Sequence, residues 1–399
     1  MGLSTLTVNV GQSGLGRRPL NKDKISGILF FNDTLPAGFS STARVKKVYS
    51  LEEAEALGIL EGSVNHDVDW YHISEYFRGN TEGELWIGFY AVPTPSYTWA
   101  EITSMLVAAG GEIRQLAVYA NGLTYASTQV TAIQAVWAAL GAAYQQVSIL
   151  YAANMAAITA VTGWAGIADL RALTARKVTV VASESGSGAG LALATAKAYS
   201  ITNIGLALGN VSKSSVEQSI GNPQNFNISD GVEMEIPALA NGDICGGVDS
   251  VISDAILGGL KDKGYLICRK YEPDITGTYF ERVPTSVASS NDFAWIEPNR
   301  TVDKAIRGVR TALIPQLNQN VLLKADGTLR DDTIGYFTDL AQTPITQMQA
   351  DDEISAGDVL IDPTQDVLGT STLTITIRIV PVGIAETIVV NIGLTTSLS

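Results

Sequence analysis

The region between residues 98 and 182 alternates helical and strand-like patterns, and no other feature constrains the fold as strongly. Helices are predicted at 98–109 and 128–144, and apolar strands at 113–119, 147–152 and 177–182. Strands that alternate with helices of about ten to fifteen residues form βαβ units, whose strands lie parallel. The nearly continuous apolar character of these strands favours burial on both faces. We therefore predict an α/β fold, α+β overall, with a βαβ-containing body on a mostly parallel core sheet.

Elements outside this region are predicted from apolar runs and helix signals. Strands are expected at 25–31 and 84–92, and a capping box of Ser50 and Glu53 should open a short helix. Residues 205–240 read as mostly loop. A long helix at 299–325 should kink at Pro315, and a second at 331–349 should break near Pro344, because proline removes a backbone donor.

Composition excludes several classes of protein. With 46% hydrophobic and 17% charged residues, the chain can bury a large core. The net charge of −14 argues against nucleic acid as a partner, since binders of nucleic acid normally carry a basic face. Two cysteines, Cys245 and Cys268, and two histidines, His66 and His72, form no metal-binding spacing. We expect inert core thiols, structural histidines, no metal and no cofactor.

The length of 399 residues indicates two or three domains. We divide the chain into an N-terminal arm, an α/β body, a C-terminal α/β core domain and a C-terminal arm. Their predicted ranges are 1–24, 25–240, 241–385 and 386–399.

Both chain ends carry alternating, β-branched runs that are typical of strands. The N-terminal run is LSTLTVNV at 3–10, and the C-terminal runs are LTITIRIVP at 373–381 and TIVVNIGL at 387–394. A terminal strand that no later sequence covers has an exposed edge, and exposed edges recruit other chains. We predict intersubunit strands with these residues: Thr5, Leu6, Thr7, Val8, Val10, Thr387, Ile388, Val389, Val390, Ile392 and Leu394.

A glycine-rich loop, Gly186 to Gly190, offers the strongest enzyme-like signal. It lies between a predicted strand and a predicted helix, where phosphate-binding loops occur. However, Leu191 stands where the dinucleotide pattern needs glycine, and the Gly-Lys-Ser/Thr ending of a P-loop is missing. Ser185 and Ser187 lack the flanking glycines of a nucleophile elbow. We favour a surface turn and no enzyme, with a nucleotide-binding α/β enzyme as the alternative.

Residues 147–168 have the length of a membrane span and carry no charged side chain. They are rich in alanine, threonine and glycine, so their insertion would be weak, and they divide into a strand and a helix. We favour a buried core over membrane insertion.

Four basic residues, Arg300, Lys304, Arg307 and Arg310, recur at helical spacing in the predicted long helix. Such a stripe either contacts an acidic partner surface or forms a solvated helix face. The acidic run 351–353 is expected to shape a turn before a strand rather than to bind a cation.

The C-terminal third of the chain resembles contractile tail sheath proteins of myophages and related injection systems. The segments that carry this resemblance are YLICRKYEPDITGTYFERV, SNDFAWIEPNRTVDKAIRGVRTAL, DGTLRDDTIGYFTDL and MQADDEISAGDVLIDPTQDVLGTSTLTITIRIVPVGIAETIVVNIGL. The resemblance makes residues 241–385 a conserved sheath core domain. The match rests on the order of the elements, and residues 25–240 are not matched in detail. The resemblance implies that these residues include the outward-facing, variable part of a sheath subunit.

The resemblance implies a structural subunit that stacks as hexameric rings into a helical polymer around an inner tube. Contraction of such a polymer drives the tube through a target envelope. Neighbours would be linked by strand exchange of their arms, with hinges at 11–21 and 382–386. The implied partners are other copies, the inner tube protein, the baseplate and the tail terminator. The basic stripe becomes the candidate contact with the tube, and the expected location is a phage tail or tail-like particle assembled in the bacterial cytoplasm.

Overall fold

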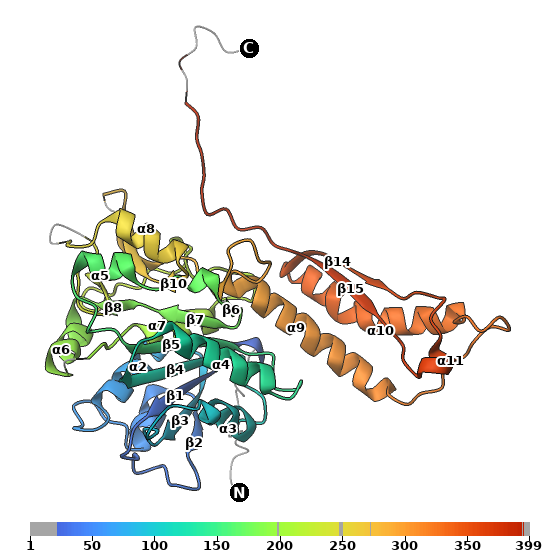
Figure 1. The fold of residues 1–399 in the computed structure, drawn as a ribbon, viewed down its shortest axis with the longest axis horizontal. Helices are drawn as coiled ribbons and strands as arrows, with labels where there is room; N and C mark the ends of the chain where they lie inside the picture. The colour runs from blue at the N-terminus through green and yellow to red at the C-terminus, as the bar shows by residue number, and fades with distance from the viewer. Residues whose placement is uncertain (1–21, 198, 247–249, 272, 393, 395–399) are drawn as a thin grey trace, which may run out of the picture.

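The computed structural model describes residues 22–392 and residue 394, apart from residues 198, 247–249 and 272. A layered α/β body carries an elongated C-terminal projection, which we define as residues 296–381 (Figure 1). The chain beyond residue 381 leaves the base of this projection as an extended tail (Figure 1).

A seven-stranded sheet forms the centre of the body, in the order β10-β7-β5-β4-β1-β3-β2. Every pairing in it is parallel except that of the edge strand β2 with β3. The predicted parallel core sheet is therefore confirmed. The strands are β1 (Ile25–Phe31), β2 (Val45–Val48), β3 (Glu84–Tyr90), β4 (Gln115–Thr124), β5 (Ser148–Asn154), β7 (Val178–Val181) and β10 (Tyr265–Leu266).

One face of the sheet is covered by α2 (Asp67–Gly79) and α7 (Ile204–Lys213). These helices pack so closely that a Cβ atom at Gly205 of α7 would lie 2.1 Å from the carbonyl oxygen of His72 in α2. The prediction that residues 205–240 are mostly loop is wrong for residues 205–213, which belong to α7. Nine of the ten residues of this helix are buried, so it lacks the polar face from which amphipathic helices are recognised.

The other face is covered by α3 (Ala100–Ala108), α4 (Ser127–Ala139), α5 (Ala160–Gly166) and α8 (Asp254–Asp262). The apolar segment 147–168 divides into β5 and α5, as predicted. Among the described residues, no helix is both long and apolar enough to cross a membrane. The predicted cap of α1 (Leu51–Ala56) is present, since the Ser50 hydroxyl accepts a hydrogen bond from the backbone N–H of Glu53.

Short elements complete the body around its sheet. They are η1 (Lys22–Lys24), η2 (Leu170–Ala172), β6 (Thr174–Ala175), β8 (Ser183–Ser185), α6 (Gly188–Lys197), β9 (Pro237–Leu239), β11 (Cys268–Tyr271), β12 (Ile275–Phe280) and β13 (Ser286–Val287).

The projection consists of two long helices and a two-stranded antiparallel hairpin, β14 with β15 (Figure 1). Its elements are α9 (Ile296–Leu313), η3 (Ile314–Gln316), α10 (Asp331–Ala350), β14 (Ile354–Leu360), α11 (Val367–Thr370) and β15 (Thr376–Pro381). A small core of Ala305, Ile345, Met348 and Ile354 holds it together.

The two proline predictions are wrong. The first helix ends at Leu313 instead of kinking at Pro315, and Pro315 lies within the 3-10 turn Ile314–Gln316. The second helix continues through Pro344. The ring of Pro344 packs over Gly308 of α9, where a side chain would approach it to 2.7 Å.

Candidate assembly surfaces

The C-terminal arm is extended and exposed beyond Glu386. Residues 387–392 form no strand, and Ile388 and Ile392 are 80% and 91% exposed. Over its described residues, the predicted strand at 387–394 is thus absent from the single chain, in which no neighbouring strand supplies hydrogen bonds. Pairing of this segment with another subunit stays a prediction. The predicted N-terminal strand residues, Thr5, Leu6, Thr7, Val8 and Val10, lie outside the described residues.

The β14–β15 hairpin leaves strand edges without partners. Within the described part of the chain, β14 pairs with β15 alone. On the inner face, Ile377 and Ile379 pack against the core of the projection, whereas Arg378 and Val380 alternate with them and are exposed. A two-stranded hairpin is marginally stable and has open edges, so it is a natural acceptor for further strands.

The basic stripe lies largely inside the subunit. Arg300 is 4% exposed, and its guanidinium donates to the hydroxyl and carbonyl oxygens of Ser214 and to the carbonyl oxygen of Ser215. Burial lowers the pKa of Arg300 to about 10. A buried guanidinium is out of reach of an inner tube, so the expectation for Arg300 is corrected to an internal role.

Lys304 and Arg307 also serve internal contacts. Lys304 Nζ lies 3.0 Å from Asp23 Oδ2 and forms a short contact with Glu353, and Arg307 pairs with Asp23. Burial alone would raise the pKa of Asp23, but Arg307 and Lys304 bring it below its ordinary value. Of the four stripe residues, only Arg310 has neither an ion pair nor a side-chain hydrogen bond within the described chain. Contact of Arg310 with a tube stays a prediction.

A second ion-pair group lies at the base of the projection. Arg282 Nε lies 3.3 Å from Glu297 in the first turn of α9, and its Nη1 lies 2.5 Å from Glu386 Oε1. Lys261 of α8 reaches the other oxygen of Glu386 at 3.2 Å. The C-terminal arm is therefore fixed to the body at Glu386, the last residue of the predicted hinge 382–386.

Two family models match nearly the whole chain. The one described as DUF2586, N-terminal domain, matches residues 5–283, and the one described as DUF2586, C-terminal domain, matches residues 292–399. The chain belongs to the DUF2586 family. The two matches are separated by residues 284–291, which lie between Arg282 and α9, at the base of the projection. No curated protein sequence matches this one.

Two solved structures share the fold of this DUF2586 protein over nearly its full length. The helical sheath of the anti-feeding prophage (AFP) in its contracted state matches with a TM-score of 0.64 and 14% identity, covering 98% of this chain and 99% of that chain. A chain of the AFP baseplate, 6-fold symmetrised, matches with a TM-score of 0.62 and 15% identity, covering 99% and 100%. The predicted resemblance to a contractile sheath protein is thus confirmed at the level of the fold.

The glycine-rich loop of the DUF2586 chain already holds an anion of its own. The backbone N–H groups of Ala189 and Gly190, at the start of α6, donate to the carboxylate of Glu233 at 2.8 and 3.2 Å. Tyr71 donates to the same carboxylate at 2.6 Å. Glu233 therefore takes the position at the helix N-terminus that a phosphate would need in the nucleotide-binding alternative.

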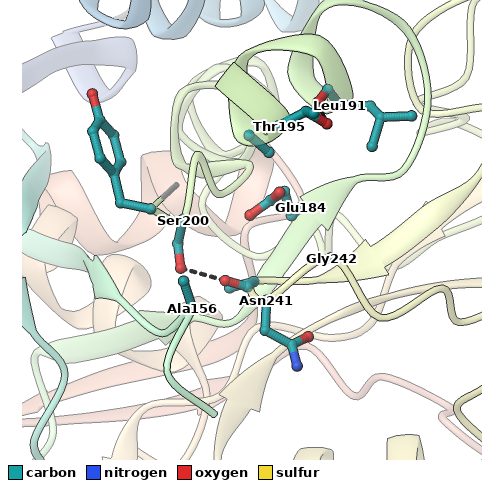
Figure 2. Close-up of a pocket in the computed structure, with 10 residues that line it drawn as sticks. Ala156, Glu184, Leu191, Thr195, Ser200, Asn241 and Gly242 are labelled. Atoms are coloured by element: carbon teal, nitrogen blue, oxygen red, sulfur yellow. Dashed lines mark hydrogen bonds between the residues drawn. The ribbon is translucent and has the colours of Figure 1, made fainter. Parts of the chain in front are cut away.

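A pocket of about 270 Å³ lies beside α6, at the carboxyl ends of β5 and β7 (Figure 2). Its polar groups serve the backbone. The carboxylate of Glu184 accepts from Ile201 N–H at 3.1 Å, and burial raises its pKa to about 7. The Ser200 hydroxyl donates to the carbonyl oxygen of Ala240 (Figure 2), and the Thr195 hydroxyl to that of Leu191. An activated nucleophile would donate its proton to a base. Both of these hydroxyls donate to backbone carbonyl oxygens instead.

The histidines and cysteines, which were the other candidates for a chemical role, lie in the protein core. His66 contacts Asp69 at 2.9 Å, and His72 is enclosed by aromatic rings without a hydrogen-bond partner for either ring nitrogen. Both histidines are buried. Cys245 and Cys268 are buried and unpaired, and burial raises both thiol pKa values. No group of metal-ligating side chains occurs in the part of the chain that the structure describes.

Proposed function

We propose that this DUF2586 protein is a structural subunit of a contractile tail sheath. The observation that carries the proposal is the full-length match to the AFP sheath protein, which includes both the body and the projection. In this proposal the subunits form hexameric rings, stack helically around an inner tube, and contract to drive that tube through a target envelope. Baseplate and tail terminator proteins bind the two ends of the polymer, and the particle is a phage tail or tail-like particle assembled in the bacterial cytoplasm.

Strand exchange links the subunits in this proposal. The C-terminal arm of one copy, residues 387–394, adds to the open edge of the β14–β15 hairpin of another, and the predicted N-terminal strand does likewise. Eight extended residues span about 26 Å, whereas the six residues of β15 span about 20 Å, so the arm can pair along the whole strand. The arm also has a suitable pattern, since Ile388, Val390 and Ile392 share one face of an extended chain.

The proposed work of contraction comes from interface area gained between bodies, while the arms keep neighbours connected. Heterologous contacts of this kind generate open helical polymers rather than closed dimers. Arg310 is the one stripe residue that we retain as a candidate contact with the inner tube. A non-enzymatic role is supported by the Glu233 carboxylate, which binds the backbone N–H groups of the glycine-rich loop.

The test is negative-stain electron microscopy of the purified protein, alone and together with its inner tube. We expect hollow, striated tubes of uniform width. Val390→Asp with Ile392→Asp should abolish the tubes and leave the melting temperature of the monomer unchanged, because both side chains are exposed in the single chain. Asn391→Asp is the matched control on the opposite face of the arm.

Two results would contradict the proposal. Tubes that persist in the doubly substituted protein would exclude exchange of the C-terminal strand. Failure of the wild-type protein to polymerise around its inner tube would exclude the sheath function itself.

A further inference from the structure

Arg282 bridges the two ends of the projection. The guanidinium binds Glu297, where α9 begins, and Glu386, where the chain has returned from β15. It also lies over the ring of Trp295, 4.4 Å from the ring centroid. We call this group, Arg282 with Glu297 and Glu386, the Arg282 bridge. The C-terminal arm leaves the subunit directly from it.

Lys304 forms a second bridge two turns further along α9. Its ammonium group pairs with Asp23, the second described residue after the N-terminal segment, and with Glu353, which directly precedes β14. Arg307 adds a second contact to Asp23. We call Lys304 with Asp23 and Glu353 the Lys304 bridge. Each terminal segment is thus joined to α9 by a cation between two carboxylates.

Three of the four carboxylates in the two bridges are buried, whereas the side chain of Glu386 is 29% exposed. Glu297, Asp23 and Glu353 are 2%, 7% and 5% exposed. Two apolar surfaces can shift against each other and stay buried. A buried carboxylate that loses its cation, in contrast, is left without hydration or a partner, which is strongly destabilising. The start of α9 is also joined to the body by polar contacts of Arg300 and Asp303. Displacing α9 at one bridge therefore disturbs the charge pairing at the other.

We propose that the two bridges set the directions in which the terminal segments leave the subunit, and that α9 couples them. A partner that pulls one segment away from its bridge then changes the orientation of the other segment. The inference rests on the proposed function only for the identity of the partners, which there are neighbouring subunits. In a sheath, the coupling would pass a change at one neighbour to the next.

The test measures the position of the C-terminal arm in the full-length monomer. Spin labels on Val64→Cys in the body and Val390→Cys in the arm report a distance distribution, and both sites are exposed, at 87% and 71%. The native thiols, Cys245 and Cys268, are buried and escape labelling.

Removal of the Arg282 bridge should broaden this distribution. Val390 lies four residues from Glu386 and nine from Pro381, which is the next fixed point when the bridge is open. Because the excursion of a flexible chain grows as the square root of its length, Glu386→Ala should widen the distribution about 1.5-fold. Asp23→Ala, which removes the carboxylate that pairs with Lys304 and Arg307 of α9, should widen it in the same direction through α9. Asp332→Ala is the control, because it removes an exposed ion pair with Arg330 at the far end of the projection.

Each outcome decides one step. An unchanged width in Glu386→Ala overturns the Arg282 bridge. Widening in Glu386→Ala together with an unchanged width in Asp23→Ala overturns the coupling. Asp23→Asn, which keeps the side-chain shape, replaces Asp23→Ala if the latter does not fold. The measurement needs no polymer, so a wild-type protein that fails to assemble would count against the sheath function and not against the coupling.

Discussion

The ammonium group of Lys177 lies 2.5 Å from Oδ2 of Asp303, and both side chains are buried. Lys177 directly precedes β7 in the body, and Asp303 lies within α9, so this ion pair joins the central sheet to the helix that carries the projection. A buried pair of this kind contributes less to stability than its short distance suggests, because both charges have lost their hydration.

Removing one partner of this pair should be more harmful than removing both. Lys177→Met leaves the carboxylate of Asp303 buried without its cation, and we expect the free energy of unfolding to fall by about 3–5 kcal/mol. Lys177→Met combined with Asp303→Leu should recover most of that loss. Urea denaturation of the three proteins measures the difference. Equal losses in the single and double variants would show that the pair itself is the stabilising interaction.

His72 should make the protein less stable in mild acid. Burial lowers the pKa of His72 from 6.5 to about 3, so the folded state keeps the ring neutral while the unfolded state protonates it. Between those values the unfolded state binds more protons, and stability falls by about 1.4 kcal/mol per pH unit as the pH decreases. His72→Phe, which keeps the stacking on Phe30, should remove this part of the slope. Identical slopes in denaturation series from pH 7 to about pH 4 would contradict the prediction.

Gly190 should tolerate no side chain. A Cβ atom there would approach the Tyr71 hydroxyl to 2.5 Å and Glu233 to 2.7 Å, so we expect Gly190→Ala to destabilise the protein by about 1–3 kcal/mol. Gly258→Ala in α8 is the matched control, because nothing lies within 4 Å and alanine favours helices, with a gain of up to about 1 kcal/mol. Thermal denaturation measures both. A melting temperature that rises with millimolar nucleotide would instead support the nucleotide-binding alternative.

Two arginines of the predicted stripe should behave differently. Arg300→Leu leaves the carbonyl oxygens of Ser214 and Ser215 without their donors, and we expect a loss of about 2 kcal/mol or more. Arg310→Leu should change stability by less than about 0.5 kcal/mol. If the predicted tube contact is correct, Arg310→Leu should also weaken co-sedimentation with the inner tube. A destabilised Arg310→Leu protein would contradict the difference.

Acid should open the Arg282 bridge. Burial alone would raise the pKa of Glu386, but Arg282 and Lys261 bring it below 4.5. A carboxylate with a lowered pKa contributes its stabilisation fully above pH 4.5 and loses it as the pH falls through the folded value. The Val64–Val390 spin-label distribution should therefore widen below about pH 4 and stay constant above pH 5. In Glu386→Ala, the width should not depend on pH over this range.

The elements that could be predicted from sequence are those with a local signal. The apolar run of β1 gives Ile25–Phe31, the same bounds that the structure has, and the strand–helix alternation gives the parallel sheet. Each depends on side-chain periodicity within one segment. The order of elements in the C-terminal third was sufficient for the resemblance to sheath proteins.

Other features depend on contacts between distant segments. The α7 helix, Ile204–Lys213, was missed because it is buried on all sides. The segment 387–392, which has a strand-like sequence, forms no strand in the single chain. The sequence displays Arg300 and Lys304 as a surface stripe, but the fold places Ser214 and Asp23 against them. Sequence by itself determined the layers of this protein and its family resemblance, since both follow from local hydrophobic patterns. Only the tertiary structure decided which charges are internal, because a side chain's partner is set by residues far away in the chain.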